Sequence, residues 1–352
     1  MSLDVPTAVF TRGASMVVAA ASRPASDVPR GPRDFLSARP DGAYTVAEAR
    51  RATPSAPYVL DDARAHVERL ARAAETPREA TREACADALR VALDACAAHD
   101  AFDGFDAVVV TALARAVDAN ARGEVVVDVL VRGARRDEKT ERDDAGSVGA
   151  YVDVANARTR SAREPWDVKY SGWIRERAPF ERRLAAWNAA NPNDACVECV
   201  MTRAVVDADG EIVDHELLEG LTTNFAAVSS SMTNERTIHR ACENVLRGVA
   251  MDRLDAALRA ASAARRAADS ESTDPSPPSP VTLSNVLSGV YDAAFITNAL
   301  KPAVPIDYLI IDRGAAAPPR RVPLPRSRAL RARLLDVHVP AAVAHPTAHA
   351  DA

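Results

Sequence analysis

The sequence predicts a soluble α/β (α+β) protein with two domains, and three observations carry this prediction. The chain has 352 residues, 47% of them hydrophobic, and this length exceeds what one compact core usually holds. Segments whose apolar residues recur at helical spacing alternate with β-rich segments. The charged and glycine-containing stretch 132–149 interrupts both patterns and predicts a domain junction. We therefore expect domains at residues 1–150 and 151–312, followed by an extended tail at 313–352.

The first half of the chain is dominated by predicted helices. In order, we expect short strands and turns over 1–60, helices at 61–74 and 78–98, an alanine-rich helix at 105–122 and a strand at 124–131. Asp61 is a suitable N-cap for the first helix, and Pro77 precedes the second, where proline is favoured. Gly123 is suited to close the alanine-rich helix.

The second half contains a predicted β-meander followed by mixed elements. We expect strands at 196–206 and 211–218 around a turn at 207–210, helices at 237–242 and 249–267, a helical stretch at 284–292, and strands at 294–298 and 306–311. The Ser-, Pro- and Asp-rich segment 269–280 is too polar to pack, so we expect it to be a disordered surface insertion.

Charge and cysteine content restrict the partners and the compartment. A net charge of −5 and the absence of an apolar run of about 18 residues argue against nucleic-acid and membrane partners. The five cysteines are sparse and odd in number, which favours reduced thiols in the cytoplasm, with an organelle as the alternative. Cys196 and Cys199 lack a second pair at metal-ligand spacing, so we expect no metal site.

The few lysines single out one residue. Only Lys139, Lys169 and Lys301 are lysine among 44 basic residues. Lys169 is followed by Tyr170 and lies close to two tryptophans in the sequence. Desolvation by aromatic rings lowers the pKa of a lysine and leaves an amine that attacks carbonyl carbons. The alternative is a lysine whose stem lies on an aromatic surface while its ammonium stays in water.

Three other residues suggest a binding site. Glu219 lies between apolar residues and precedes a glycine and Thr-Thr-Asn, as in a backbone that bends around a ligand; the alternative is an exposed glutamate in an ordinary hairpin. Gly248 precedes a helix, whose first amides would suit a phosphate, although most such glycines are only caps. Arg69 lies one helical turn after His66 and, taken alone, would be a surface arginine.

Taken together, five segments resemble the fold-type IV pyridoxal-phosphate (PLP) enzymes, the class IV aminotransferase superfamily. In order they are Gly42-Ala43-Tyr44-Thr45; His66-x-x-Arg69-Leu70; Lys169 before an aromatic residue; Glu219-Gly220-x-Thr222-Thr223-Asn224-Phe225; and Leu246-x-Gly248-Val249 followed by Phe295-Ile296-Thr297-Asn298-Ala299-Leu300 and Val304-Pro305-Ile306-Asp307. Within the superfamily the chain looks closest to plant and algal proteins similar to D-amino-acid aminotransferases, which share Gly-Ala-Tyr-Thr and Lys-Tyr-Ser-x-Trp.

This resemblance implies an architecture and an activity. The implied protein is a homodimer that binds PLP in the cleft between its two domains and moves an amino group between an amino acid and a 2-keto acid. One alternative is a PLP lyase of the 4-amino-4-deoxychorismate type, because Asn298 with Leu300 resembles that branch. Another is a catalytically inactive dimer that binds PLP or lacks a cofactor.

The resemblance also implies residue roles. Lys169 would bind the cofactor covalently and move a proton, and Glu219 would meet the pyridine nitrogen. The remaining cofactor-binding residues would be Arg69, Asn224, the amides of Val249 and Ala250, and the loop of Asn298 and Ala299; Tyr44, Arg135 and Arg136 would contact the substrate. Ala250 and Ala299 replace hydroxyl residues of many members, which removes two phosphate donors. Ile174 replaces the tyrosine of branched-chain members, so we expect a different substrate.

Overall fold

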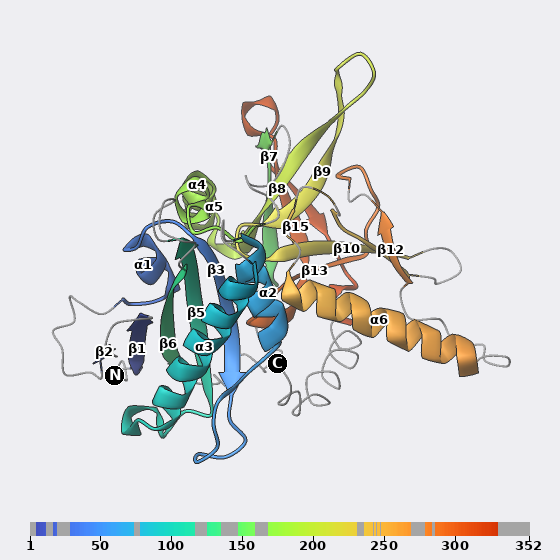
Figure 1. Cartoon of the computed structure of the whole chain (residues 1–352). Coiled ribbons are helices and arrows are strands. Elements are labelled where there is room, and N and C mark those ends of the chain that lie inside the picture. Colours follow the sequence, from blue (N-terminus) through green and yellow to red (C-terminus); the bar gives the residue numbers. More distant parts are fainter. Residues whose placement is uncertain are drawn as a thin grey trace. The chain divides into compact units, whose positions relative to one another are not determined.

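The computed structural model divides the chain into two compact units (Figure 1). It describes residues 5–11, 17–19, 29–73, 78–116, 125–134, 147–158, 168–230, 236–241, 243, 245–246, 248–268, 279–283 and 286–329. The first unit comprises Met1–Asp144 and Val168–Glu176, and the second comprises Ala145–Asp167 and Arg177–Ala352. The segment Val168–Glu176 returns to the first unit, where Tyr170 forms a bridge with Ala43.

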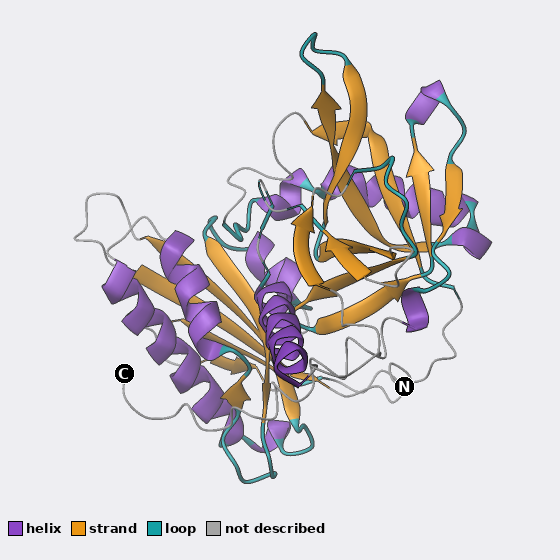
Figure 2. Ribbon diagram, turned by 90° about the vertical axis from the view of Figure 1, so that its right-hand side faces the viewer, coloured by secondary structure: helices purple, strands orange, loops and turns teal. Residues whose placement is uncertain are grey.

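The first unit is an antiparallel sheet with helices on its faces. Its strand order is β2-β1-β6-β5-β3-β4, with β1 Thr7–Thr11, β2 Val17–Ala19, β3 Ala43–Arg50, β4 Val59–Leu60, β5 Ala107–Ala116 and β6 Val125–Ala134. The helical elements are α1 Pro32–Ser37, α2 Ala63–Ala73, α3 Arg78–Ala97, η1 Asp100–Phe102 and α4 Trp173–Glu176. Helices α2 and α3 cover one face, where Leu70 and Leu89 pack with Val108 and Val129 (Figures 1 and 2). The predicted helices 61–74 and 78–98 and the strand 124–131 are confirmed.

The predicted helix at 105–122 is wrong, because this segment forms the central strand β5. Alanine has a high intrinsic helix propensity, which is a weak preference that tertiary context overrides. Here β5 pairs with β3 on one side and β6 on the other. Ala112 packs on the face that α2 and α3 cover, and Leu113 packs with Phe35 of α1 on the other. Burial on both faces removes the apolar–polar alternation by which an exposed strand is recognised.

The second unit contains two five-stranded sheets. One has the order β16-β15-β7-β8-β9, with β7 Gly149–Arg158, β8 Cys196–Val206, β9 Ile212–Gly220, β15 Tyr308–Asp312 and β16 Arg320–Pro323. The other has the order β12-β11-β10-β13-β14, with β10 Asn224–Ser230, β11 Arg236–His239, β12 Ser279–Leu283, β13 Ala293–Asn298 and β14 Lys301–Ile306. Its helical elements are α5 Ala178–Ala190, η3 Pro192–Asp194, α6 Val249–Ala268 and η4 Gly314–Ala316. Leu217 of the first sheet and Phe225 and Ile296 of the second share one core.

Several predictions for this unit need correction. The segment predicted as a helix at 237–242 lies mainly in β11, since Ile238 pairs with Val228 and is buried beside α6. Residues 286–292 form a bridge and turns instead of a helix. Ser279 and Pro280 begin β12, while 269–278 lie outside the described residues. The tail is not simply extended, because β16 pairs with β15 and buries Leu324; residues 330–352 lie outside the described part.

The meander prediction is confirmed, and it leads to the corner where the chain passes between the two sheets. Strand β9 ends at Gly220 and β10 begins at Asn224. The amide of Gly220 donates to the carbonyl oxygen of Thr223 at 2.9 Å, which closes a tight turn. This corner places Glu219 at the end of one sheet and Asn224 at the start of the other.

Candidate functional site

Lys169 is held against strand β3 of the first unit. The amide of Tyr44 donates to the carbonyl oxygen of Lys169 at 2.7 Å, and the amide of Ser171 donates to that of Gly42 at 2.9 Å. The ammonium nitrogen of Lys169 lies 5.0 Å from the centre of the Tyr44 ring. The half-buried lysine therefore has an aromatic neighbour from a distant strand, whereas the sequence suggested the rings adjacent to Lys169 along the chain.

The segment after Lys169 is anchored by polar contacts. The hydroxyl of Ser171 accepts from the amide of Gly42 at 3.1 Å and donates to Asp41 at 3.3 Å. Arg175 forms an ion pair with Asp41, and its hydrogen bonds hold the pKa of Asp41 below its usual value. Ile174 is buried with Tyr44 and Leu130, so it is a core residue. These contacts restrict the backbone that carries Lys169.

Arg69 and His66 are buried one turn apart on α2. Arg69 is 7% exposed, so the interpretation as a surface arginine is wrong. The ring nitrogen Nδ1 of His66 lies 2.6 Å from the hydroxyl of Thr45. Burial and the charges of Arg69 and Lys169 lower the pKa of His66 to about 3. The structure thus brings Tyr44, His66, Arg69 and Lys169 together in the first unit.

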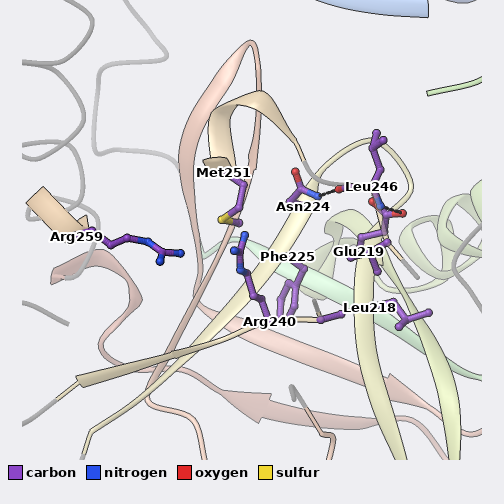
Figure 3. A pocket seen from close by; sticks show the side chains of 10 residues that line it. Leu218, Glu219, Asn224, Phe225, Arg240, Leu246, Met251 and Arg259 are labelled. Carbon is purple, nitrogen blue, oxygen red and sulfur yellow. Dashed lines mark hydrogen bonds between the residues drawn. The ribbon is translucent and has the colours of Figure 1, made fainter. Parts of the chain in front are cut away.

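Glu219 lines a cavity of about 210 Å³ in the second unit (Figure 3). The carboxylate accepts from the amide of Leu246 at 3.3 Å, and the residue is only 2% exposed, so it is not an exposed hairpin glutamate. Other residues lining the cavity include Asn224, Phe225, Arg240, Leu246 and Met251. The cavity therefore presents a buried carboxylate together with a guanidinium.

Glu198, which the sequence interpretation missed, organises the turn after Glu219. Its buried carboxylate accepts from the amide of Leu221 at 3.1 Å and from the hydroxyls of Thr222 and Thr223, each at 2.9 Å. A sequence signal was available, because Glu198 lies two residues after Cys196 and two before Val200 and therefore shares their face of β8. An acidic residue at an inward strand position indicates a paired, functional or structural carboxylate.

Asn224 connects this turn to the start of α6. Its amide nitrogen donates to the carbonyl oxygen of Leu246 at 2.6 Å. A Cβ atom at Gly248 would lie 1.9 Å from the side-chain oxygen of Asn224, so any other residue there would force the Asn224 side chain to shift. Val249 and Ala250 follow as the first residues of α6, where amides lack acceptors within the helix.

The turn between β13 and β14 carries the remaining predicted cofactor-binding residues, Asn298 and Ala299. The amide nitrogen of Asn298 donates to the carbonyl oxygen of Thr222 at 3.5 Å, and the amide of Leu300 donates to Asn298 at 2.9 Å. Ala299 lies in this turn. The structure therefore connects Glu219, Asn224, the start of α6 and Asn298 around one corner of the second unit. The predicted substrate residues Arg135 and Arg136 lie outside the described residues.

Arg240 is a second charged group that the sequence interpretation missed. It forms an ion pair with Asp255 of α6, and the two side chains are 13% and 9% exposed. No motif marked Arg240, because its partner is 15 residues away. Arg259, one helical turn after Asp255, also lines the cavity.

The described residues contain neither a candidate metal site nor a candidate membrane-spanning helix. Their His, Cys, Asp and Glu side chains form no group of three or more that could hold a metal ion. None of the helices in the described part of the chain combines the length and apolar character that crossing a bilayer requires.

Comparison with known proteins identifies the fold. No protein-family model and no curated protein sequence matches the chain. Solved structures do match: a branched-chain amino acid aminotransferase from Thermobaculum terrenum in its PLP form has a TM-score of 0.54 at 14% identity, covering 96% of this chain and 95% of that one. The chain has the fold of the fold-type IV aminotransferases.

Two further structures support the same conclusion. A hypothetical aminotransferase from Mycobacterium tuberculosis in its PLP-bound form has a TM-score of 0.53 at 16% identity, covering 95% of this chain and 99% of that one. A fold IV-transaminase from Curtobacterium pusillum has a TM-score of 0.51 at 13% identity, with 94% and 98% covered. The predicted fold class is therefore confirmed.

Proposed function

We propose that this protein is a PLP-dependent aminotransferase that moves an amino group between an amino acid and a 2-keto acid. The observation that carries the proposal is the buried carboxylate of Glu219 on a cavity of about 210 Å³, in a chain with this fold. Two of the matching structures are PLP-bound forms. The residues present fit such a group, because they include a shielded carboxylate, guanidinium groups and helix-start amides.

Bound PLP supplies an electron sink that weakens the bond between Cα and hydrogen of an amino acid. The amine of Lys169 would hold the cofactor covalently and then carry the proton released at Cα. The Glu219 carboxylate would keep a proton on the ring nitrogen, since an anion favours the protonated form. Arg69 would bind the phosphate, as would the amides of Val249 and Ala250.

The remaining residues shape the site in this proposal. Asn224 holds the carbonyl oxygen of Leu246, and the Asn298–Ala299 turn would close over the phosphate. Tyr44 supports the Lys169 amine through its ring and would face the substrate, with Arg135 and Arg136 as carboxylate-binding residues.

The proposal also includes the nearest relatives of the protein, its substrate class, its oligomeric state and its cellular location. Gly42-Ala43-Tyr44-Thr45 and Lys169-Tyr170-Ser171-x-Trp173 support a place near plant and algal proteins similar to D-amino-acid aminotransferases. A core isoleucine at 174 supports a substrate other than a branched-chain amino acid. We further propose a homodimer, as the resemblance implies, located in the cytoplasm.

Absorption spectroscopy of the purified protein with PLP tests the proposal. We expect a visible band in the wild type that Lys169→Ala lacks and Lys139→Ala retains. Borohydride reduction should fix the cofactor on the peptide containing Lys169, and a screen of amino donors should then show transfer to a keto acid. An unchanged spectrum in Lys169→Ala, or a label on another lysine, would overturn the assignment.

A further inference from the structure

The ion pair of Arg240 and Asp255 places a guanidinium on the wall of the Glu219 cavity. Arg240 follows β11 and lines the cavity, whereas Asp255 lies in the second turn of α6. The two side chains are 13% and 9% exposed, so both charges are largely withdrawn from water. Removing charges from water is costly unless each is paired, and Asp255 provides that pairing for Arg240. The guanidinium is therefore fixed where a ligand in the cavity would meet it.

Two guanidinium groups, those of Arg240 and Arg259, lie on the cavity wall, and Asp255 balances the charge of the first. Among the described residues that line the cavity, Arg240 and Arg259 are cationic and Glu219 is anionic (Figure 3). Arg259 is itself a residue of α6, four positions after Asp255, whereas Arg240 is held to α6 by its ion pair with Asp255. The planar guanidinium presents several N–H donors in a geometry that matches carboxylate and phosphate oxygens. A group already held by Asp255 loses less conformational entropy when it binds.

Two hydroxyl donors that many members of the resembling superfamily offer to the phosphate are absent from this chain, so another side-chain donor would matter more here. Ala250 and Ala299 carry no hydroxyl and offer only their backbone amides. A charge-assisted hydrogen bond from Arg240 would offset part of that loss.

We propose that this cavity is an oxyanion site in which Arg240, positioned by Asp255, contacts the ligand. The identity of the ligand rests on the proposed function: the oxyanion is either the phosphate monoester of PLP or the side-chain carboxylate of a dicarboxylic amino acid. Asp255 acts through Arg240 and is a positioning residue. The two sources share their chemistry and differ in the molecule that carries the charge.

Paired substitutions separate this role from a structural one. Arg240→Met alone leaves Asp255 buried without its cation, so the main variant is Arg240→Met with Asp255→Leu, which removes both charges. The matched control is Arg203→Met with Glu216→Leu, since Arg203 and Glu216 form a similar pair at 24% and 10% exposure that does not line the cavity. Tryptophan fluorescence of each apoprotein is titrated with inorganic phosphate, PLP and pyridoxal.

Phosphate recognition predicts that the main variant loses at least about tenfold in affinity for PLP and inorganic phosphate, the equivalent of one charge-assisted hydrogen bond. Its affinity for pyridoxal should match that of the wild type and control. Carboxylate recognition predicts unchanged PLP binding but a similar loss, in the PLP-loaded protein, for glutamate and not for alanine. Wild-type affinity of the main variant for phosphate, PLP and glutamate would overturn the proposal. If wild-type protein forms no PLP band but binds phosphate through Arg240, the proposed function fails while the oxyanion site stands.

Discussion

Gly220 lies so close to Glu198 that a Cβ atom at residue 220 would come within 2.6 Å of Glu198 Cγ. The same atom would come within 2.4 Å of the Thr223 hydroxyl. The glycine therefore lets the corner between β9 and β10 close around the carboxylate of Glu198. Because Glu219 immediately precedes this glycine, the position of one carboxylate depends on the packing around another.

We expect Gly220→Ala to destabilise the protein by about 1–3 kcal/mol, the usual cost of forcing atoms into a packed interior. Gly104→Ala is the matched control, since nothing lies within 4 Å of the Cβ it would add, and it should change stability by less than about 0.5 kcal/mol. Urea unfolding of both variants measures the difference. Equal stabilities would show that the corner relaxes without cost.

Glu198→Ala should lower the free energy of unfolding by about 1–3 kcal/mol. The substitution removes the carboxylate that accepts from the buried hydroxyl of Thr223, whereas the amide of Leu221 keeps the carbonyl oxygen of Cys199 as an acceptor at 3.2 Å. Glu211→Ala provides a control at an exposed position and should stay within about 0.5 kcal/mol of the wild type. Chemical denaturation gives both values, and a small effect at Glu198 would contradict its organising role.

His66 should make the protein less stable at acidic pH. Its pKa falls from 6.5 to about 3 in the folded protein, so between these values the unfolded chain binds a proton that the folded chain does not. Stability contributed by this group is therefore complete above pH 6.5 and decreases as the pH falls toward 3. From about pH 7 to about pH 5.5 the loss should be about 1 kcal/mol. His66→Gln should remove this part of the pH dependence in denaturation curves, and an identical pH profile would contradict the prediction.

Arg69→Ala should weaken PLP binding strongly, because Ala250 and Ala299 offer the phosphate no hydroxyl. Ala250→Thr should tighten binding by up to about 1–2 kcal/mol if the added hydroxyl donates to the phosphate. Titration of each apoprotein with PLP measures both effects. Unaltered affinity in Arg69→Ala would place the phosphate elsewhere and contradict the role proposed for this arginine.

Local sequence patterns were sufficient to predict helices and strands that have one face exposed to solvent. Helices α2 and α3 were predictable from apolar spacing and their start signals, and β8 and β9 from a β-rich meander around a clear turn. The same method failed for β5, because a central strand buried on both faces shows no alternation and its alanines favour a helix.

The sequence by itself determined the fold class and singled out Lys169, Glu219 and Arg69, because their residue types and order along the chain carry that information. Their roles at a cofactor remain predictions. Only the tertiary structure decided that Glu198 holds the turn of Thr223 and that Arg240 pairs with Asp255. These contacts join residues 25 and 15 positions apart, respectively. No local spacing specifies such pairs, since chain folding alone brings them together and burial makes each charge require its partner.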